Sequence, residues 1–350
     1  MVHRVTDRMG AGVNDGRRPT MRDVAARAGV SLKTVSRVVN DEAGVSPALV
    51  GRVRQAVDDL GFRPNVGASV LRRADARTAS VGLLLDDVAD PFSATVLRAV
   101  QDAAQARGVV VLSASMDGDA GRERSLAAAF AARRVDGLIL QPAGADQCYL
   151  APEVASGTAV VCVGRMPGRL DVDAVVATDA AGAASAVRHL AAAGHTRIAF
   201  LGDRAAGAAR LAGYRAGLEA AGLVPDPALV VPDLADAALA AQAVTALFRT
   251  SAPPTALFTA RAAVTVAALR TVHRLGLQRL VAVIGFGDFV TADLLSPAVT
   301  VVAQDVRRIG TTAADLLFAR LAREAGPPAT YPVPTVLVPR GSGELPPPPR

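Results

Sequence analysis

Residues 21–40, MRDVAARAGVSLKTVSRVVN, contain two short helical patterns on either side of a glycine, and they constrain the fold more than any other stretch. Val24 and Ala28 lie on one apolar stripe of a helix of about two turns. Gly29 can adopt the left-handed conformation that ends a helix, and Ser31 is placed to cap the next one. The pattern predicts two short helices joined by a tight turn.

The second helical pattern separates an inward apolar face from an outward polar face. Three valines are expected to point inward, namely Val35, Val38 and Val39. The outward face carries side chains that can read base edges or bind phosphates, namely Leu32, Lys33, Ser36, Arg37 and Asn40. An ordinary helical hairpin with a solvated face shows the same pattern, so this stretch alone leaves both interpretations open.

The positive charge of the chain is concentrated at the same end. Residues 1–77 contain 14 Arg or Lys and 8 Asp or Glu, whereas residues 78–350 contain 24 of each. The formal net charge of +6 therefore lies in the first segment, and Lys33 is the only lysine in the protein. A basic segment joined to a neutral one is suited to binding a polyanion such as DNA with one end of the chain.

A specific motif extends over residues 20–71. It reads D-V-A-x-x-A-G-V-S-x-x-T-V-S-R-V-x-N, followed by V-S, a third amphipathic helix expected at residues 47–60, and L-G-F-x-P-N. The motif resembles that of the LacI/GalR family of bacterial repressors, and the match runs without a gap. The resemblance implies a homodimeric transcriptional repressor that binds a pseudo-palindromic DNA operator under the control of a small-molecule effector. Activation in place of repression is left open.

The resemblance also implies which residues contact DNA. Leu32 and Lys33 lie at the first two positions of the reading helix, and Arg37 can form two hydrogen bonds with O6 and N7 of guanine. Hydroxyl and amide side chains are expected at the phosphate backbone, namely Thr20, Ser31, Thr34, Ser36, Asn40 and Asn65.

Residues 64–73 contain a segment too short to form a stable helix alone, because helix nucleation in water is costly. In the resembled family this segment is a hinge helix that pairs with its twin across the dimer and enters the minor groove. There Leu71 would insert into the central base step and Ala68 would face the floor of the groove. The alternative is a plain linker.

From residue 80 the sequence alternates between apolar strand patterns and amphipathic helix patterns. Strands are expected at residues 80–86, 109–113, 137–140, 158–163, 197–202, 229–231, 256–259, 281–285 and 334–339. Helices are expected at residues 92–107, 122–134, 181–193, 209–221, 237–250, 263–275 and 307–323. Residues 174–178 and 299–302 are expected to be extended crossovers between subdomains.

These patterns predict an α/β fold class with a distinct N-terminal unit. A three-helix helix-turn-helix domain and hinge helix come first, followed by a core of two doubly wound parallel-sheet subdomains. This core resembles the periplasmic-binding-protein-like core of the same family. The expected domains are a disordered arm (1–19), the DNA-binding domain (20–66), the hinge helix and linker (67–78), the effector-binding and dimerisation domain (79–340) and a disordered tail (341–350).

Ligands of such folds bind at the carboxyl ends of strands, here in a cleft between the two lobes. Effector contacts are expected from Asp90, Phe92, Gln141, Arg210, Arg261, Asp288 and Gln304. The sequence departs from the family pattern at three places. Gly164 and Gly287 each replace a common aspartate, and Arg261-Ala262 replaces a common Asn-Asp pair. These departures favour a neutral or anionic effector. A sugar read by other side chains, or a cleft that has lost its ligand, are the alternatives.

Other function classes find little support. The sequence contains no G-x-G-x-x-G, G-x-x-x-x-G-K-[ST], H-E-x-x-H or G-x-S-x-G motif, so no catalytic residue, enzyme activity or cofactor is expected. The two cysteines lack partners at metal spacing, so no metal site is expected. No segment has the length of a membrane span and no secretory signal is evident, which favours a cytoplasmic, nucleoid-associated protein. The alternatives are a solute-binding protein of the same core fold and a sugar- or nucleotide-processing α/β enzyme.

Overall fold

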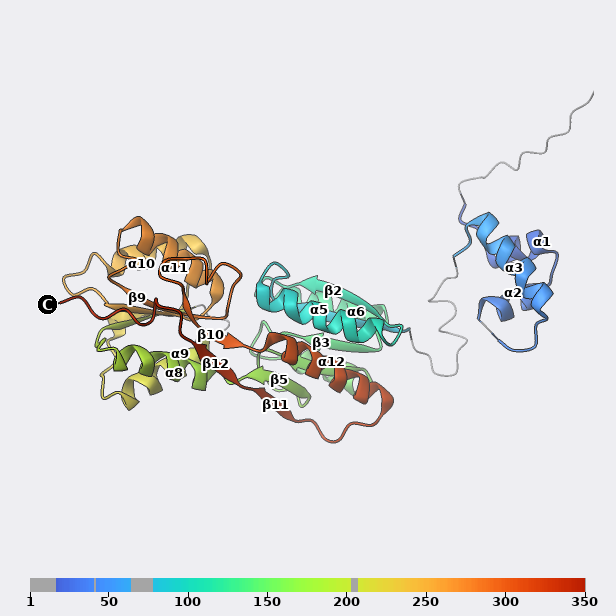
Figure 1. Cartoon of the computed structure of the whole chain (residues 1–350). Helices are drawn as coiled ribbons and strands as arrows, with labels where there is room; N and C mark the ends of the chain where they lie inside the picture. The colour runs from blue at the N-terminus through green and yellow to red at the C-terminus, as the bar shows by residue number, and fades with distance from the viewer. Residues whose placement is uncertain (1–16, 41, 64–77, 203–206, 350) are drawn as a thin grey trace, which may run out of the picture. The chain divides into compact units, whose positions relative to one another are not determined.

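The computed structural model describes residues 17–40, 42–63, 78–202 and 207–349 (Figure 1). The chain divides into two compact units, Met1–Thr78 and Ala79–Arg350. Most of the expected N-terminal arm lies outside the described residues, and so do Asn65, Ala68 and Leu71 of the expected hinge helix.

The first unit contains α1 (Met21–Ala28), α2 (Leu32–Val39) and α3 (Pro47–Leu60). A capping box starts α1: the Thr20 hydroxyl accepts from the Asp23 amide, and the Asp23 carboxylate accepts from the Thr20 amide at 2.7 Å. These reciprocal bonds satisfy two backbone donors that a helix start leaves unpaired.

The turn between α1 and α2 has the predicted local chemistry. Gly29 ends α1 in the left-handed conformation, with φ of 61°, and the Ser31 hydroxyl accepts from the Thr34 amide at the start of α2. The three helices enclose a small apolar core formed by Val24, Ala25, Ala28, Val35, Val38, Val53, Ala56 and Phe62. The predicted helix-turn-helix is therefore present in full.

The second unit has two lobes, each built on a six-stranded sheet. The sheet of the N-terminal lobe has the order β11-β5-β4-β3-β1-β2. Its strands are β1 (Ser80–Leu85), β2 (Val110–Ser115), β3 (Gly137–Leu140), β4 (Ala159–Val163), β5 (Asp173–Ala177) and β11 (Thr330–Val333). All neighbours in this sheet are parallel.

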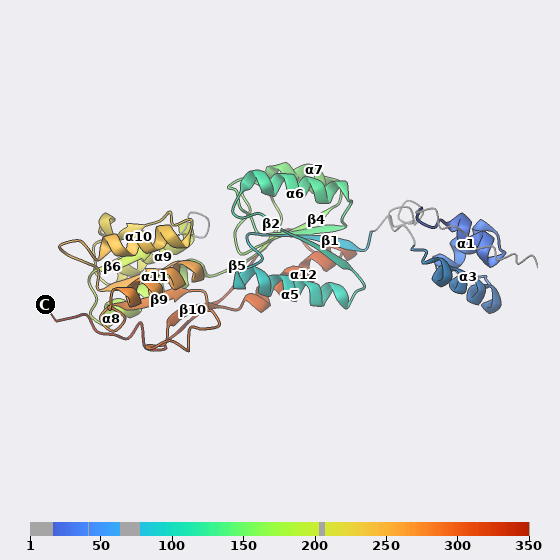
Figure 2. The same ribbon diagram turned by 90° about the horizontal axis from the view of Figure 1, so that it is seen from above.

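Helices cover both faces of that sheet. One face packs against α5 (Pro91–Gln105) and α12 (Val306–Ala322), and the other against α6 (Ala120–Ala132) and α7 (Ala151–Ala155), as Figure 2 shows. A 3-10 turn, η1 (Cys148–Leu150), precedes α7. The strands bury apolar residues on both faces, which explains their continuous apolar runs in the sequence.

The sheet of the C-terminal lobe has the order β12-β10-β9-β8-β6-β7. Its strands are β6 (Ile198–Leu201), β7 (Val230–Val231), β8 (Ala256–Thr259), β9 (Ala282–Phe286), β10 (Thr300–Gln304) and β12 (Thr335–Val338). Only β12 is antiparallel to its neighbour among these described strands. One face packs against α8 (Asp179–Ala192) and α9 (Gly207–Ala220), and the other against α10 (Ala237–Leu247) and α11 (Ala262–Arg274) (Figure 1). A 3-10 turn, η2 (Pro227–Leu229), precedes β7.

The structure corrects the expected elements where the chain passes between lobes. The segments expected as crossovers, 174–178 and 299–302, are sheet strands, because they form ladders as β5 and β10. The last strand expected at 334–339 is present as β12 in the C-terminal sheet, but a strand that was not expected, β11, precedes it and belongs to the N-terminal sheet. Which sheet a short apolar run joins depends on distant partners, and local pattern does not contain that information.

The expectation of a disordered tail over 341–350 is also wrong where the structure describes it. Ser342 is 3% exposed, and its hydroxyl donates to the carbonyl of Val283. The carbonyl oxygen of Leu345 lies 2.8 Å from Nε2 of buried His195. Burial lowers the pKa of His195. Specific hydrogen bonds to the C-terminal lobe therefore order a segment whose Gly- and Pro-rich composition suggested disorder.

Candidate functional site

The outward face of α2 is exposed in the first unit. Leu32 is 45% exposed and Lys33 is exposed on the first turn of the helix. The Arg37 guanidinium lies on the last turn, 3.9 Å from the Glu42 carboxylate, and retains 43% of its side-chain exposure. A loose ion pair of this kind is weak in water and leaves the guanidinium available to another acceptor. Three of the residues expected to contact bases, Leu32, Lys33 and Arg37, therefore share one accessible helix.

Five of the polar residues expected at the phosphate backbone belong to the described part of this unit, namely Thr20, Ser31, Thr34, Ser36 and Asn40. Ser31 and Thr34 hydroxyl oxygens are 2.9 Å apart, and the Asn40 side-chain amide donates to the Ser36 hydroxyl at 3.3 Å. Thr20 is partly exposed at the start of α1. These bonds fix the orientation of groups that retain further donor or acceptor capacity.

One positioning residue in this unit was missed by sequence reasoning. The Arg52 guanidinium, on α3, donates to the carbonyls of Ala28 and Gly29 at the end of α1. It binds carbonyls that the helix end leaves unpaired and ties the turn before α2 to α3. In the sequence, Arg52 is a polar residue of an amphipathic helix pattern, and that pattern does not distinguish an arginine that binds distant carbonyls from one that is solvated.

A cleft of about 1230 Å³ lies between the two lobes of the second unit. All seven residues expected to contact an effector line it: Asp90, Phe92, Gln141, Arg210, Arg261, Asp288 and Gln304. They come from the carboxyl ends of strands and the first turns of helices in both lobes. The topology thus brings together residues that are far apart in the sequence.

The N-terminal wall of the cleft contains a hydrogen-bonded group at the ends of β1 and β3. The Gln141 side-chain oxygen accepts from the Asp86 amide at 3.1 Å and from the Ser93 hydroxyl at 3.3 Å. Buried Asp86 in turn lies 3.0 Å from the Arg165 guanidinium. Asp86 and Arg165 were not among the predicted contacts, although both follow strand ends.

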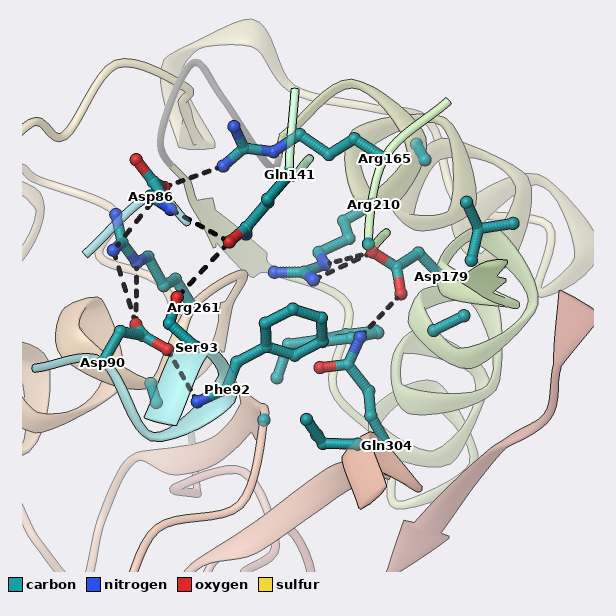
Figure 3. A pocket seen from close by; sticks show the side chains of 18 of the residues that line it. Asp86, Asp90, Phe92, Ser93, Gln141, Arg165, Asp179, Arg210, Arg261 and Gln304 are labelled. Carbon is teal, nitrogen blue, oxygen red and sulfur yellow. Dashed lines mark hydrogen bonds and ion pairs between the residues drawn. The ribbon is translucent and has the colours of Figure 1, made fainter. Parts of the chain in front are cut away.

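The start of α5 brings two predicted residues to the cleft. Asp90 is the N-cap of α5, and its carboxylate accepts from the Phe92 amide at 2.9 Å. In Figure 3 the Phe92 ring lies centrally, between the Arg261–Asp90 pair and the Asp179–Gln304 pair. An aromatic ring at this place offers an apolar face on which a ligand ring can pack.

The C-terminal wall is organised by Arg210 on α9. Its guanidinium binds the Asp179 carboxylate at 2.8 Å and donates to the Ala260 carbonyl. It also lies over the Phe286 ring, 4.0 Å from the ring centroid. The second oxygen of Asp179 accepts from the Gln304 side-chain amide at 3.1 Å. Arg210 is only 8% exposed, so this set is rigidly held. Asp179 was not among the predicted contacts.

Arg261 spans the cleft. It comes from the C-terminal lobe, and its guanidinium lies 3.4 Å from the carboxylate of Asp90 and 4.0 Å from that of Asp86, both in the N-terminal lobe. The sequence favoured a neutral or anionic effector, and Arg261 was the cation expected to attract an anion. Two carboxylates compensate the charge of Arg261 here, so it no longer favours an anion over a neutral molecule.

Asp288 lies at the edge of the cleft, and its carboxylate points to Arg340. Two guanidinium nitrogens of Arg340 donate to its two oxygens at 2.7 and 2.6 Å, and these bonds lower the pKa of Asp288. Gly164 has φ of +70°, and a Cβ added there would lie 3.0 Å from the Phe92 ring. Gly287 has φ of +88°. The local backbone and Phe92 therefore suit glycine at both departures from the family pattern.

Acidic and basic side chains alternate along the cleft walls as pairs: Arg165 with Asp86, Arg261 with Asp90, and Arg210 with Asp179. The lining is therefore close to electrically neutral in its interior. Within the described ranges, no three His, Cys, Asp or Glu side chains are grouped so as to hold a metal ion. Such a cleft offers many hydrogen-bond partners and an aromatic face, which suits a small polar molecule.

Models of two protein families match segments of this chain. Residues 20–65 match the family "Bacterial regulatory proteins, lacI family", and residues 187–343 match the "Periplasmic binding protein-like domain". The ribose operon repressor of Escherichia coli K12 is 30% identical over 335 residues, which cover 92% of this chain and 99% of that repressor. The PurR repressor of Aliivibrio salmonicida is 28% identical over 308 residues, covering 86% and 92% of the two chains.

Solved structures show the same relationship. The lac repressor dimer bound to operator and the anti-inducer ONPF has a TM-score of 0.79 and 25% identity, covering 93% of this chain and 99% of that one. The CelR–cellobiose complex has a TM-score of 0.68 and 31% identity, covering 93% and 100%. No helix in the described part of this chain is long and apolar enough to cross a membrane. The chain belongs to the LacI family of transcriptional repressors, which are DNA-binding regulators rather than enzymes.

Proposed function

We propose that this repressor binds a pseudo-palindromic operator as a homodimer and responds to a small effector held between its core lobes. The observation that carries the proposal is one exposed reading helix in the same chain as a ligand cleft. One helix-turn-helix reads one half-site, so two copies are needed to read a two-fold operator. The relative solved as a dimer on its operator supports this arrangement.

The proposed domains have the boundaries that the sequence predicts. Residues 20–66 bind DNA, residues 67–78 form the hinge helix and linker, and residues 79–340 bind effector and dimerise. Base contacts are assigned to Leu32, Lys33, Arg37, Ala68 and Leu71, and backbone contacts to Thr20, Ser31, Thr34, Ser36, Asn40 and Asn65. The hinge assignments rest on the motif alone, since Asn65, Ala68 and Leu71 lie outside the described residues.

Exposed apolar side chains on the C-terminal lobe support dimerisation. Val290 and Leu294, in the segment after β9, are 91% and 76% exposed. Large apolar side chains this exposed are costly in water, and contact with a second copy would bury them. The regulator acts on chromosomal DNA, so we place it in the cytoplasm with the nucleoid.

We propose that the effector is a small neutral polar molecule such as a sugar. The predicted contacts are Asp90, Phe92, Gln141, Arg210, Arg261, Asp288 and Gln304. Paired charges in the cleft support a neutral ligand, because an added anion would meet carboxylates beside every guanidinium. The relatives named as a ribose operon repressor and as a cellobiose complex support the sugar class.

A thermal-shift screen tests the effector class. The full-length protein is melted with neutral monosaccharides and disaccharides, sugar acids, sugar phosphates and purines at matched concentrations. At least one neutral sugar is expected to raise the melting temperature in proportion to the logarithm of its concentration, because a ligand that binds only the folded state stabilises it by mass action. A panel in which acids or phosphates raise the melting temperature and no neutral sugar does would contradict the proposed class.

A further inference from the structure

Arg261 is placed to join the lobes rather than to support its own helix. It is the N-cap residue of α11, with extended backbone, and its side chain makes no capping hydrogen bond to that helix. Instead, the side chain leaves the C-terminal lobe and reaches Asp90, the N-cap of α5 in the N-terminal lobe (Figure 3). Each partner is thus fixed at the rigid start of a helix.

The geometry of this contact gives it electrostatic weight. Nε and Nη2 of Arg261 both lie 3.4 Å from Oδ2 of Asp90, and Nη2 lies 4.0 Å from Oδ2 of Asp86. The side chains of Arg261, Asp90 and Asp86 are 26%, 15% and 8% exposed, so water and salt screen the pair less than they screen a surface ion pair.

The neighbouring ion pairs of the cleft do not have this property. Arg165 and Asp86 both belong to the N-terminal lobe, and Arg210 and Asp179 both belong to the C-terminal lobe. Separating the lobes would leave those two pairs intact. It would break the contact of Arg261 with Asp90 and expose the charges to water.

We propose that Arg261, Asp90 and Asp86 form an interlobe clasp that holds the cleft closed before any effector binds. The inference rests on the proposed function in one respect, since it takes this cleft as the effector site. Closure then no longer depends on the effector alone. The clasp also makes Arg261 a specificity-determining residue, because two carboxylates already compensate the charge of its guanidinium when a ligand binds.

The clasp has a consequence for effector affinity. If only the closed arrangement makes full contact with the ligand, the apparent dissociation constant rises as the closed fraction falls. A chain without the clasp therefore binds the same effector more weakly, even though the other contacts of the cleft are unchanged.

Interlobe distance in the free, full-length protein tests the clasp. The first fluorophore is attached to Cys148, which is exposed in the N-terminal lobe, whereas Cys162 is buried. Val224, which is 89% exposed in the C-terminal lobe, is changed to cysteine to carry the second fluorophore. A hydrogen bond to Asp146 raises the pKa of Cys148, so labelling is done at alkaline pH. Labelled protein is diluted into excess unlabelled protein, so that energy transfer reports distances within one chain.

Two variants remove the clasp without removing a helix cap. Arg261→Asn places a favourable capping residue at the start of α11, and Asp90→Asn keeps the cap of α5 while removing its charge. Each is expected to raise the ratio of open to closed molecules roughly tenfold. Arg165→Met is the matched control, because it removes a cleft guanidinium that pairs with Asp86 inside one lobe but leaves both interlobe contacts of Arg261 in place, so it is expected not to open the cleft.

Equal distance distributions for the wild type and both clasp variants would overturn the proposal, provided that their melting curves show cooperative folding. Opening by Arg165→Met to the same degree would also overturn it. The measurement contains neither DNA nor effector. A negative result therefore leaves the proposed repressor function standing, and failure of the repressor function leaves this result intact.

Discussion

Replacing Lys33 with alanine is expected to relax the preference of the protein for one base pair in each half-site by roughly 10- to 100-fold. Lys33 lies exposed on the first turn of α2, and Ser31 caps that turn. Its ammonium group can donate to the two acceptors that guanine presents in the major groove. Removing it leaves the backbone contacts in place, so affinity falls for the preferred base and little for the others.

Asn65→Ala is the comparison for Lys33→Ala, since Asn65 is assigned to the phosphate backbone. A contact to phosphate fixes position but carries no base information, so this variant is expected to weaken all sites alike. Fluorescence anisotropy on a set of half-site variants at fixed salt distinguishes the two patterns. Uniform weakening by both variants would remove the assignment of Lys33 to a base edge.

Arg210→Lys is expected to weaken effector binding roughly 10- to 100-fold while leaving effector-free operator affinity within about twofold. The Arg210 guanidinium binds Asp179, the Ala260 carbonyl and the Phe286 ring at once, and it lines the cleft. Lysine keeps the charge that compensates Asp179, but it lacks the planar fork that makes several directed bonds. Because Arg210 lies within the cleft, the substitution is expected to lower the affinity for effector and to leave operator affinity without effector almost unchanged.

Arg320→Lys controls for the loss of any bidentate arginine pair. Arg320 binds both oxygens of buried Asp173 at 2.7 and 3.0 Å, and neither residue lines the cleft. Effector titrations by thermal shift are compared for the two variants, using the sugar that the screen identifies. Equal loss of effector affinity in both would show that Arg210 acts through stability rather than through the ligand.

The first unit was predictable from sequence because its signals are local. Thr20 and Asp23 form a capping box over three residues, Gly29 supplies the left-handed turn, and Ser31 caps the next helix. Each signal depends on neighbours within about one turn of helix. The role of Arg52 was missed because its acceptors lie more than twenty residues away in the chain.

The second unit was predictable in its elements but less so in its long-range pairing. Alternating strand and helix patterns predicted the two-lobed α/β core. Because ligands of such folds bind at the carboxyl ends of strands, seven residues near those ends were predicted to line one cleft, and they do. The paths of β11 and β12 and the packing of Ser342 depend on partners that no local window contains.

The pairing of charges was the least predictable part of the cleft. In the sequence, Arg261 is a departure from the family pattern, and together with the missing aspartates it favoured a neutral or anionic ligand. The structure shows that Asp90 and Asp86, more than 170 residues earlier, compensate that charge. Arg261, which suggested a class of ligand in the sequence, thus makes an intramolecular contact in the fold.

Selection of DNA from a random pool by the full-length protein tests whether the chain reads a two-fold operator under effector control. At physiological salt, we expect enrichment of a pseudo-palindrome with two half-sites, and release of that DNA, or tighter binding to it, when the effector from the thermal-shift screen is added. Binding no stronger than to unselected DNA, or enrichment of a single half-site without symmetry, would contradict this expectation.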